Sequence, residues 1–321
     1  MNLRSKKIYI AGASGMVGSA IKRKLESESY QNLIYISSAE LNLINQAEVE
    51  DFFLKVKPEI VILSAAKVGG ILANNSYRAE FIYDNLMIEA NVIHAAYKNQ
   101  VEKLLFLGSS CIYPKNAPQP LKEEDLLSGY LENTNEPYAI AKIAGVKLCE
   151  NYYLQYGCNF FSVMPTNLYG KYDNFDLENS HVIPALIRKF HEAKIHNSEK
   201  AVLWGTGAPR REFLYVDDLA EAVVFLLENA DAGNFYRQGI SHLNIGTGND
   251  IRIDELACLV KEIVGYKGEV NYDSSKPDGT SRKLLDISRL SALGWTSKTS
   301  LKDGLRKTYE WFLESAAVKV V

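Results

Sequence analysis

Short apolar runs alternate with longer amphipathic segments through the first half of the chain. In segments such as 79–99, AEFIYDNLMIEANVIHAAYKN, apolar residues recur at helical spacing. The apolar runs between such segments are residues 7–11, 33–37, 60–64, 104–107 and 160–164. Strands that alternate with helices are typical of a parallel sheet covered by helices on both faces. The pattern therefore predicts an α/β fold with a doubly wound parallel sheet.

The second half is more mixed, and it contains no repeat, low-complexity tract or linker. We therefore expect the second half to interleave with the first half rather than to form a separate domain after it. The predicted dinucleotide-binding domain spans residues 1–168, with a return from about 211–245. A smaller α/β substrate domain is predicted mainly over residues 169–321.

Composition narrows the class of protein. The 321 residues are 47% hydrophobic and 23% charged, which is ordinary for a soluble globular protein, and the net charge of −3 gives no electrostatic reason to bind nucleic acid or a membrane surface. No stretch is long enough to span a bilayer. Cys111, Cys149, Cys158 and Cys258 show no CxxC spacing, which indicates neither a zinc site nor a disulfide framework. We expect a reduced, cytoplasmic enzyme.

A glycine-rich segment, GASGMVG, follows the first apolar run and opens an amphipathic segment. Gly12, Gly15 and Gly18 would permit a tight turn, close approach of a pyrophosphate and close packing of the helix on the sheet. The helix N-terminus would then present free N–H donors to the phosphates. A glycine-rich turn alone is often only a turn, but in this strand-to-helix position it predicts a dinucleotide site.

The second apolar run ends at Ser37-Ser38-Ala39, where NAD-binding proteins usually carry an acid for the ribose 2′-hydroxyl. The absence of an acid there disfavours NAD, and no arginine is present to bind a 2′-phosphate. Ser14, Ser37 and Ser38 can hydrogen-bond a phosphate, but they are equally plausible as turn residues.

Tyr138 and Lys142, in EPYAIAKIAG, are four residues apart and share one helical face. An ammonium beside a phenol favours the phenolate and brings the pair toward a useful range for acid–base catalysis. Such a pair alone mostly indicates a surface helix. With Ser109 upstream at a strand end and the glycine loop before both, it predicts a dehydrogenase.

With these motifs the chain resembles the extended short-chain dehydrogenase/reductases, which share its G-x-x-G-x-x-G spacing and have the Rossmann fold. More narrowly it resembles the GDP-L-fucose synthase family, the epimerase-reductases that act on GDP-4-keto-6-deoxy-D-mannose. The similarity runs almost end to end, through GMVGSAI, AAKVGGI, GSSCIYP, NEPYAIAKIAG, MPTNLYG, NSHVIPALIRKFHEA, REFLYVDDLA and SKPDGTSRKL. The family implies a homodimer, NADPH as hydride donor and a GDP-sugar substrate.

The resemblance also implies roles for the reacting groups. A ketone at sugar carbon 4 acidifies the hydrogens on carbons 3 and 5, and inversion needs two groups of moderate pKa on opposite faces of the ring. The family assigns the base to Cys111 and the acid to His181. Tyr138 would then protonate the C4 oxygen during reduction, Ser109 would hydrogen-bond it, and Lys142 would hold the ribose and tune the tyrosine. Neither half-reaction calls for a metal.

The family positions also identify binding residues. Those expected against the cofactor are Gly12, Ser14, Gly15, Met16, Val17, Gly18, Ser38, Leu43, Leu107, Gly108, Ser110, Lys142, Pro165, Asn167, Leu168 and His181. Those expected against the GDP-sugar are Lys189, Trp204, Arg211, Asp278 and Lys283. Outside the resemblance, a basic residue is usually solvated surface, a tryptophan after AVL is more often core, and a Pro-Asp-Gly turn explains Asp278 equally well.

Other functions remain open at this stage. Related sugar dehydratases place an Asp-Glu pair in the segment that is SSCIY here, and the absence of a carboxylate between Ser109 and Tyr113 counts against elimination. A nucleotide-sugar 4-epimerase or a simple reductase is the nearest alternative. A non-catalytic nucleotide-binding regulator on the same fold would have no reason to keep the five reacting residues.

Overall fold

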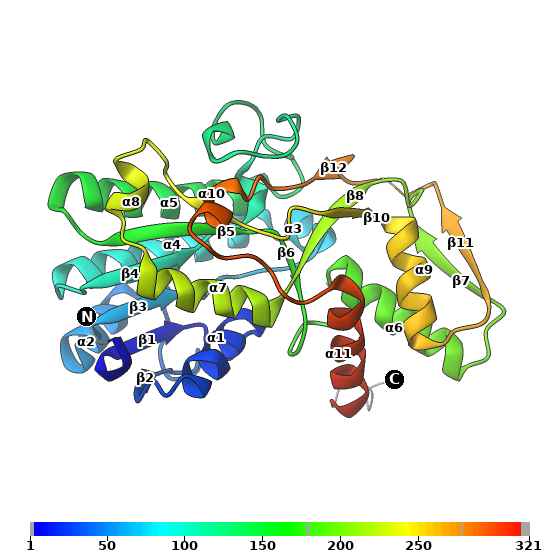
Figure 1. Cartoon of the computed structure of the whole chain (residues 1–321), viewed down its shortest axis with the longest axis horizontal. Helices are drawn as coiled ribbons and strands as arrows, with labels where there is room; N and C mark the ends of the chain where they lie inside the picture. Colours follow the sequence, from blue (N-terminus) through cyan, green and yellow to red (C-terminus); the bar gives the residue numbers. More distant parts are fainter. Residues whose placement is uncertain (1–2, 178–179, 277, 316–321) are drawn as a thin grey trace.

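The computed structural model describes residues 3–177, 180–276 and 278–315. Its larger part is a six-stranded sheet in the order β2-β1-β3-β4-β5-β9, in which every neighbouring pair is parallel. The strands are β1 Lys7–Ala11, β2 Asn32–Ile34, β3 Ile60–Leu63, β4 Lys103–Leu107, β5 Phe160–Pro165 and β9 Leu243–Ile245. The predicted α/β class with a doubly wound parallel sheet is confirmed (Figure 1).

Helices cover both faces of this sheet because successive strand residues point to opposite sides. Ile8 and Ile10 pack into the core beneath α1 (Met16–Ser27) and α7 (Val216–Asn229). Tyr9 pairs with aromatic rings on the other face, in the core beneath three further helices. Those helices are α2 Gln46–Val56, α4 Arg78–Lys98 and α5 Glu136–Tyr156.

One predicted strand is shorter than expected. The apolar run 33–37 forms a strand only as far as Ile34, because Ser37 enters a turn. The backbone N–H and Oγ of Ser37 donate to Glu40 Oε2 at 3.1 and 2.6 Å. The prediction of a strand through residue 37 was therefore wrong, since side-chain bonding of the serine replaces the ladder.

A smaller part lies beside the large sheet along the long axis of the molecule (Figure 1). Its strands are β6 Asn167–Tyr169, β7 Lys200–Trp204, β8 Arg210–Tyr215, β10 Asp250–Arg252, β11 Glu269–Asp273 and β12 Arg282–Lys283. β8 is central and pairs with β6, β10 and β12, while β7 pairs with β11. Helices α6 Val182–Ile195, α9 Ile253–Val264 and α11 Leu301–Glu314 enclose a separate apolar core.

Short elements complete the chain. They are η1 Leu3–Ser5, α3 Ile71–Ser76, η2 Ser110–Ile112, η3 Glu123–Asp125, α8 Gly233–Tyr236 and α10 Ser288–Ala292. Within the described ranges, no helix is both long and apolar enough to cross a membrane, and no group of three or more His, Cys, Asp or Glu side chains could hold a metal ion.

Candidate active site

The glycine loop joins β1 to α1 at the carboxyl edge of the large sheet. Gly12 has φ +88°, and a Cβ there would lie 2.7 Å from the backbone N of Ala65, in the segment after β3. A Cβ on Gly18 would collide with the carbonyl oxygen of Gly12. Only glycine fits these two positions, and no described side chain caps the N-terminus of α1 at Gly15. The loop thus forms the cradle that a pyrophosphate on a helix N-terminus requires.

The end of β2 is polar and open. Ser14 and Ser38 are exposed, whereas Ser37 is held by Glu40. The side-chain and backbone hydrogen bonds from Ser37 lower the pKa of the Glu40 carboxyl, so this carboxylate is ionised at neutral pH. Glu40 is thus folded back toward the strand end, although in the sequence it stands beyond the position of the usual ribose acid.

Ser109 and Tyr138 meet where β4 ends. Ser109 caps η2, and its Oγ accepts from the backbone N–H of Cys111 at 3.4 Å. Tyr138 lies in the first turn of α5, with its ring edge-on to Phe81. Burial raises the pKa of Tyr138 well above 10, Cys111 and Glu89 add to this, and a hydrogen bond with Ser109 opposes it. The phenol is therefore protonated at neutral pH.

Lys142 lies one turn further along α5 and is only 2% exposed. Its Nζ is 3.0 Å from Glu89 Oε1, and it donates to the carbonyl of Leu107 at 3.2 Å. The same Nζ is 5.8 Å from the centre of the Tyr138 ring. The structure thus brings the predicted lysine and tyrosine together at the end of β4.

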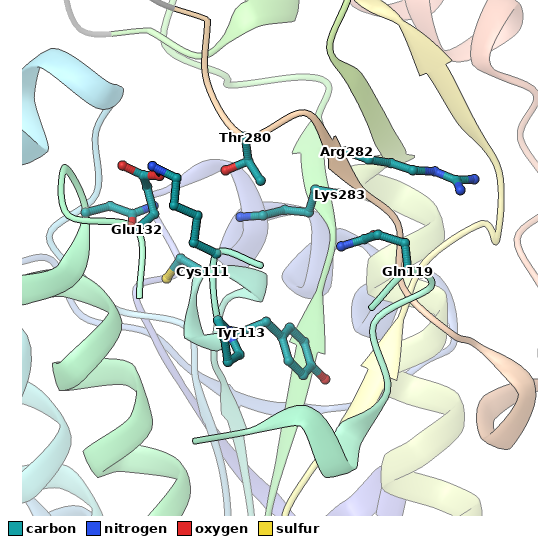
Figure 2. A pocket seen from close by; sticks show the side chains of 10 residues that line it. Cys111, Tyr113, Gln119, Glu132, Thr280, Arg282 and Lys283 are labelled. Carbon is teal, nitrogen blue, oxygen red and sulfur yellow. Dashed lines mark ion pairs between the residues drawn. The ribbon is translucent and has the colours of Figure 1, made fainter. Parts of the chain in front are cut away.

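Cys111 lies in η2, is 7% exposed and is a free thiol. Burial raises its pKa, while Lys283, the hydrogen bond with Ser109 and Lys142 lower it. Lys283 of β12 reaches the same cavity as Cys111, as Figure 2 shows, together with Glu132 and Thr280. Burial lowers the pKa of Lys283, and attraction to Cys111 raises it. Sequence reasoning expected Lys283 against the GDP-sugar, and the structure places it beside the candidate base.

His181 is the N-cap of α6 and is exposed to solvent, yet enough protein surrounds its imidazole to lower the pKa below 6.5 by desolvation. The described residues that line the Cys111 cavity do not include it. Ser109, Cys111, Tyr138 and Lys142 therefore converge from β4, η2 and α5, while the predicted acid comes from the other part of the molecule.

The predicted nucleotide residues gather on the small part. Trp204, at the end of β7, is 60% exposed and thus is not core; Lys189 Nζ lies 5.3 Å from its ring centre. Asp278 accepts from the backbone N–H and Oγ1 of Thr206, at 2.9 and 2.6 Å, so it closes the loop that follows β7. Burial lowers the pKa of Arg211, and Asp278 opposes this.

The remaining predicted cofactor residues lie along the same edge. Leu107 ends β4 and Gly108 follows it, Pro165 ends β5, and Asn167 and Leu168 begin β6. Met16 and Val17 open α1, Leu43 follows β2, and Ser110 begins η2. These segments all follow a strand of the large sheet, which is where doubly wound folds bind ligands.

Sequence reasoning missed two buried carboxylates. Glu89, on α4, stands behind Lys142. Glu212, in β8, is 0% exposed and accepts from the backbone N–H groups of Thr247, Gly248 and Leu285 at 2.6, 2.8 and 2.9 Å. The position of Glu89 on the apolar face of a predicted helix could have indicated a buried carboxylate from the sequence alone. Glu212 carries no comparable pattern.

Comparisons with known proteins agree with this architecture. Residues 8–246 match the model of the NAD dependent epimerase/dehydratase family, and the chain belongs to that family. Within it, the chain is similar to GDP-L-fucose synthases. It is 58% identical to GDP-L-fucose synthase 1 of Arabidopsis thaliana, over 98% of this chain and 95% of the relative. It is 56% identical to GDP-L-fucose synthase of Escherichia coli (strain K12), over 98% of each.

A solved structure of a GDP-L-fucose synthetase is also similar to this chain. The GDP-L-fucose synthetase of Naegleria fowleri, bound to NADP, superposes with a TM-score of 0.86 at 28% identity, over 96% of this chain and 94% of that one. The resemblance of the sequence to this family is thereby confirmed.

Proposed function

We propose that this chain is a GDP-L-fucose synthase: it epimerises GDP-4-keto-6-deoxy-D-mannose at C3 and C5, and then reduces the C4 ketone with NADPH. The observation that carries the proposal is the meeting of Cys111, Tyr138 and Lys142 at the end of β4, in a chain that matches GDP-L-fucose synthases over nearly its whole length. A dehydratase would need a carboxylic acid where Cys111 stands. A regulator would need neither the thiol nor the phenol.

Epimerisation uses the thiol as base. The C4 ketone makes the C3 and C5 hydrogens acidic, and the Cys111 thiolate removes each proton in turn. Lys283, in the same cavity, lowers the pKa of a thiol that burial otherwise raises. His181 returns a proton to the opposite face of the ring. Its lowered pKa makes it a ready proton donor once it is charged.

Reduction uses the tyrosine as acid. The raised pKa of Tyr138 keeps the phenol protonated until the C4 oxygen gains charge, and Tyr138 then donates its proton to that oxygen. Ser109 hydrogen-bonds the same oxygen, and Lys142 fixes the tyrosine and the ribose. NADPH supplies the hydride when it is bound, and the glycine loop with the N-terminus of α1 fits its pyrophosphate.

The GDP end belongs to the small part of the molecule. The exposed ring of Trp204 offers a face for the base, and the planar guanidinium of Arg211 offers a fork for the diphosphate. Lys189 supplies a further charge beside Trp204, and Asp278 supplies a ribose or base contact. Lys283 lines the Cys111 cavity and would also contact the diphosphate.

The two parts match the proposed division of labour. Residues 1–168 with the 211–245 return would hold the dinucleotide, which is supported by α7 packing on the large sheet and β9 pairing with β5, although β8 at the start of the return belongs to the small sheet. Residues 169–321 would mainly hold the substrate. We also propose a cytoplasmic location, since the four free cysteines, including the proposed base, need a reducing compartment.

A homodimer is proposed through the outer face of α4 and α5. Tyr83 and Ile140 are 58% and 41% exposed on these packed helices, and Leu154 is 65% exposed. Sedimentation of the purified protein should give twice the mass of the chain, and Ile140→Glu should shift it toward the monomer. A monomer at micromolar concentration would rule the dimer out.

Incubation with GDP-4-keto-6-deoxy-D-mannose and NADPH tests the proposed activity. NADPH absorbance should fall, and NMR of the product should show inversion at C3 and C5 together with reduction at C4. Reduction without inversion would identify a simple reductase, and no oxidation of NADPH would leave the proposal without support.

A further inference from the structure

Glu89 places a carboxylate in the interior, directly behind the active-site lysine. It is 1% exposed, and its Oε1 lies 3.0 Å from Nζ of Lys142 on the neighbouring helix. An acid at this depth is rare unless it is paired, because removing it from water is costly. The pair is therefore a built feature of the contact between α4 and α5.

The contact between the two helices is shaped around this carboxylate. Gly145 of α5 faces it, and a Cβ there would lie 2.7 Å from Glu89 Oε2 and 2.5 Å from the Phe106 ring. Burial raises the pKa of Glu89, while attraction to Lys142, its hydrogen bond and the backbone N–H of Gly145 oppose that rise. A glycine at position 145 thus leaves the room that Glu89 occupies.

The ammonium of Lys142 has three donors. One goes to the carbonyl of Leu107 at 3.2 Å, and Glu89 engages the ammonium from the protein side. The ammonium also lies toward the site, where the centre of the Tyr138 ring is 5.8 Å from Nζ. The two anchors hold the lysine in place before any ligand binds.

We propose that Glu89 is a positioning residue that acts through Lys142: it holds the ammonium at the point where the lysine orients Tyr138 and contacts the cofactor ribose. This inference rests on the roles proposed above for Lys142 and Tyr138. The competing explanation is that Glu89 only fills the contact between α4 and α5. The other titratable groups around the pair are Tyr138, Cys111 and Cys149.

A double-mutant cycle on NADPH binding separates the two explanations without measuring turnover. Glu89→Gln keeps the shape but removes the charge, and should weaken NADPH binding about tenfold, because a buried charge then lacks its partner. Glu89→Asp keeps the charge on a shorter stem and should lose less. In a Lys142→Met background, Glu89→Gln should add almost nothing, because the group through which Glu89 acts is gone. Fluorescence titration gives each dissociation constant.

The matched control is Glu150→Gln. Glu150 also pairs with a lysine of α5, Lys147 at 2.6 Å, but on the surface, so its loss should leave NADPH binding unchanged. If Glu89→Gln fails to fold, Glu89→Asp and its Lys142→Met double variant run the same cycle. Unchanged affinity in folded Glu89 variants, or an equal loss with and without Lys142, would overturn the proposal and leave Glu89 as packing.

The pH profile of reduction gives a second readout. Glu89 raises the pKa of Tyr138, so Glu89→Gln should lower it and move the alkaline loss of kcat to lower pH. Glu150→Gln should leave the profile in place, and an unshifted profile in Glu89→Gln would contradict a positioning role. If the wild type does not turn over the GDP-ketosugar, the proposed function fails, and the NADPH-binding cycle still decides the role of Glu89.

Discussion

At the scale of single residues, burial shifts the pKa of the proposed acid and of the proposed base in the same direction, with opposite consequences for their proposed roles. It raises the pKa of both Tyr138 and Cys111. A raised pKa suits the phenol, which must keep its proton until reduction. The same shift works against the thiol, which must lose its proton to act as a base. We therefore propose that the neighbouring lysines, Lys283 and Lys142, assist Cys111 by lowering the pKa of its thiol.

Replacement of Tyr138 by phenylalanine removes the proton donor and keeps the ring. A positioned general acid contributes about a hundred- to ten-thousand-fold, so NADPH-dependent reduction should fall by about that factor in Tyr138→Phe. Stopped-flow absorbance measures the hydride step, and NADPH titration checks that the site is intact. A loss below about tenfold would show that another group protonates the C4 oxygen.

Lys283 should control the reactivity of Cys111. Because Lys283 lowers the pKa of the thiol, Lys283→Met should move the alkylation of Cys111 by iodoacetamide to higher pH, whereas Lys283→Arg should keep it close to the wild type. Mass spectrometry of the Cys111 peptide measures the rate separately from the other cysteines. An identical pH dependence in Lys283→Met would assign the lysine to the nucleotide phosphates alone.

At the scale of elements, a buried hydrogen-bond network ties the loop after η2 to β9. The hydroxyl of Tyr113 contacts Nε2 of His242 at 2.7 Å, and Ser241 Oγ contacts its Nδ1 at 2.9 Å. Tyr113 also donates to the side chain of Asn244. The network fixes the segment that carries Ser109 and Cys111, and burial keeps His242 neutral.

The burial of His242 makes stability depend on pH. Burial lowers the pKa of His242 from 6.5 to about 3 in the folded protein, so below 6.5 only the unfolded chain gains the proton. Stability is therefore lost as pH falls from 6.5 toward 3, by about 2.5 kcal/mol between pH 7 and pH 4.5 from this group. Urea unfolding of the wild type and His242→Gln should differ by that amount in pH dependence. Equal slopes would show that His242 is charged in the folded protein.

Much of the fold was predictable from the sequence because it follows from local pattern. The apolar runs became strands, and segment 79–99 became α4 within a residue at each end. The glycine loop and the Tyr138–Lys142 pair were also predictable, since each lies within one element. The partners of Lys142 and Cys111 were not, because Glu89 and Lys283 come from distant elements. Contacts between residues of distant elements produce no periodic pattern in the amino-acid sequence.

At the scale of the whole molecule, we propose that the two parts bind different ligands at one edge. The large sheet supplies the glycine loop and the reacting tyrosine, and the small part supplies Arg211 and Trp204. Glu212 joins them, because β8 of the small part bonds the segment that follows β9 of the large sheet. Because the two ligands are assigned to different parts, a substitution in one part should change the binding of one ligand and leave the other nearly unchanged.

Arg211→Ala tests this separation. Loss of the fork assigned to the diphosphate should raise KM for the GDP-sugar by about tenfold or more and leave KM for NADPH nearly unchanged. Arg252→Ala is the control, because Arg252 pairs with Asp254 at the surface of the same part. Steady-state kinetics with each ligand varied in turn measures both constants. A parallel rise in both would reassign Arg211 to folding.

We propose that one site inverts two carbons with a thiol before it reduces a third. Proton exchange in deuterated solvent tests it most directly, with GDP-4-keto-6-deoxy-D-mannose and no NADPH, followed by NMR at C3 and C5. The wild type should exchange both positions. Cys111→Ser should bind NADPH normally but lose exchange by about a hundredfold or more, since serine is too weak an acid to supply the base. Cys158→Ser, a thiol outside the site, should exchange normally. Wild-type exchange at both carbons in Cys111→Ser would contradict the account and leave Cys111 as packing.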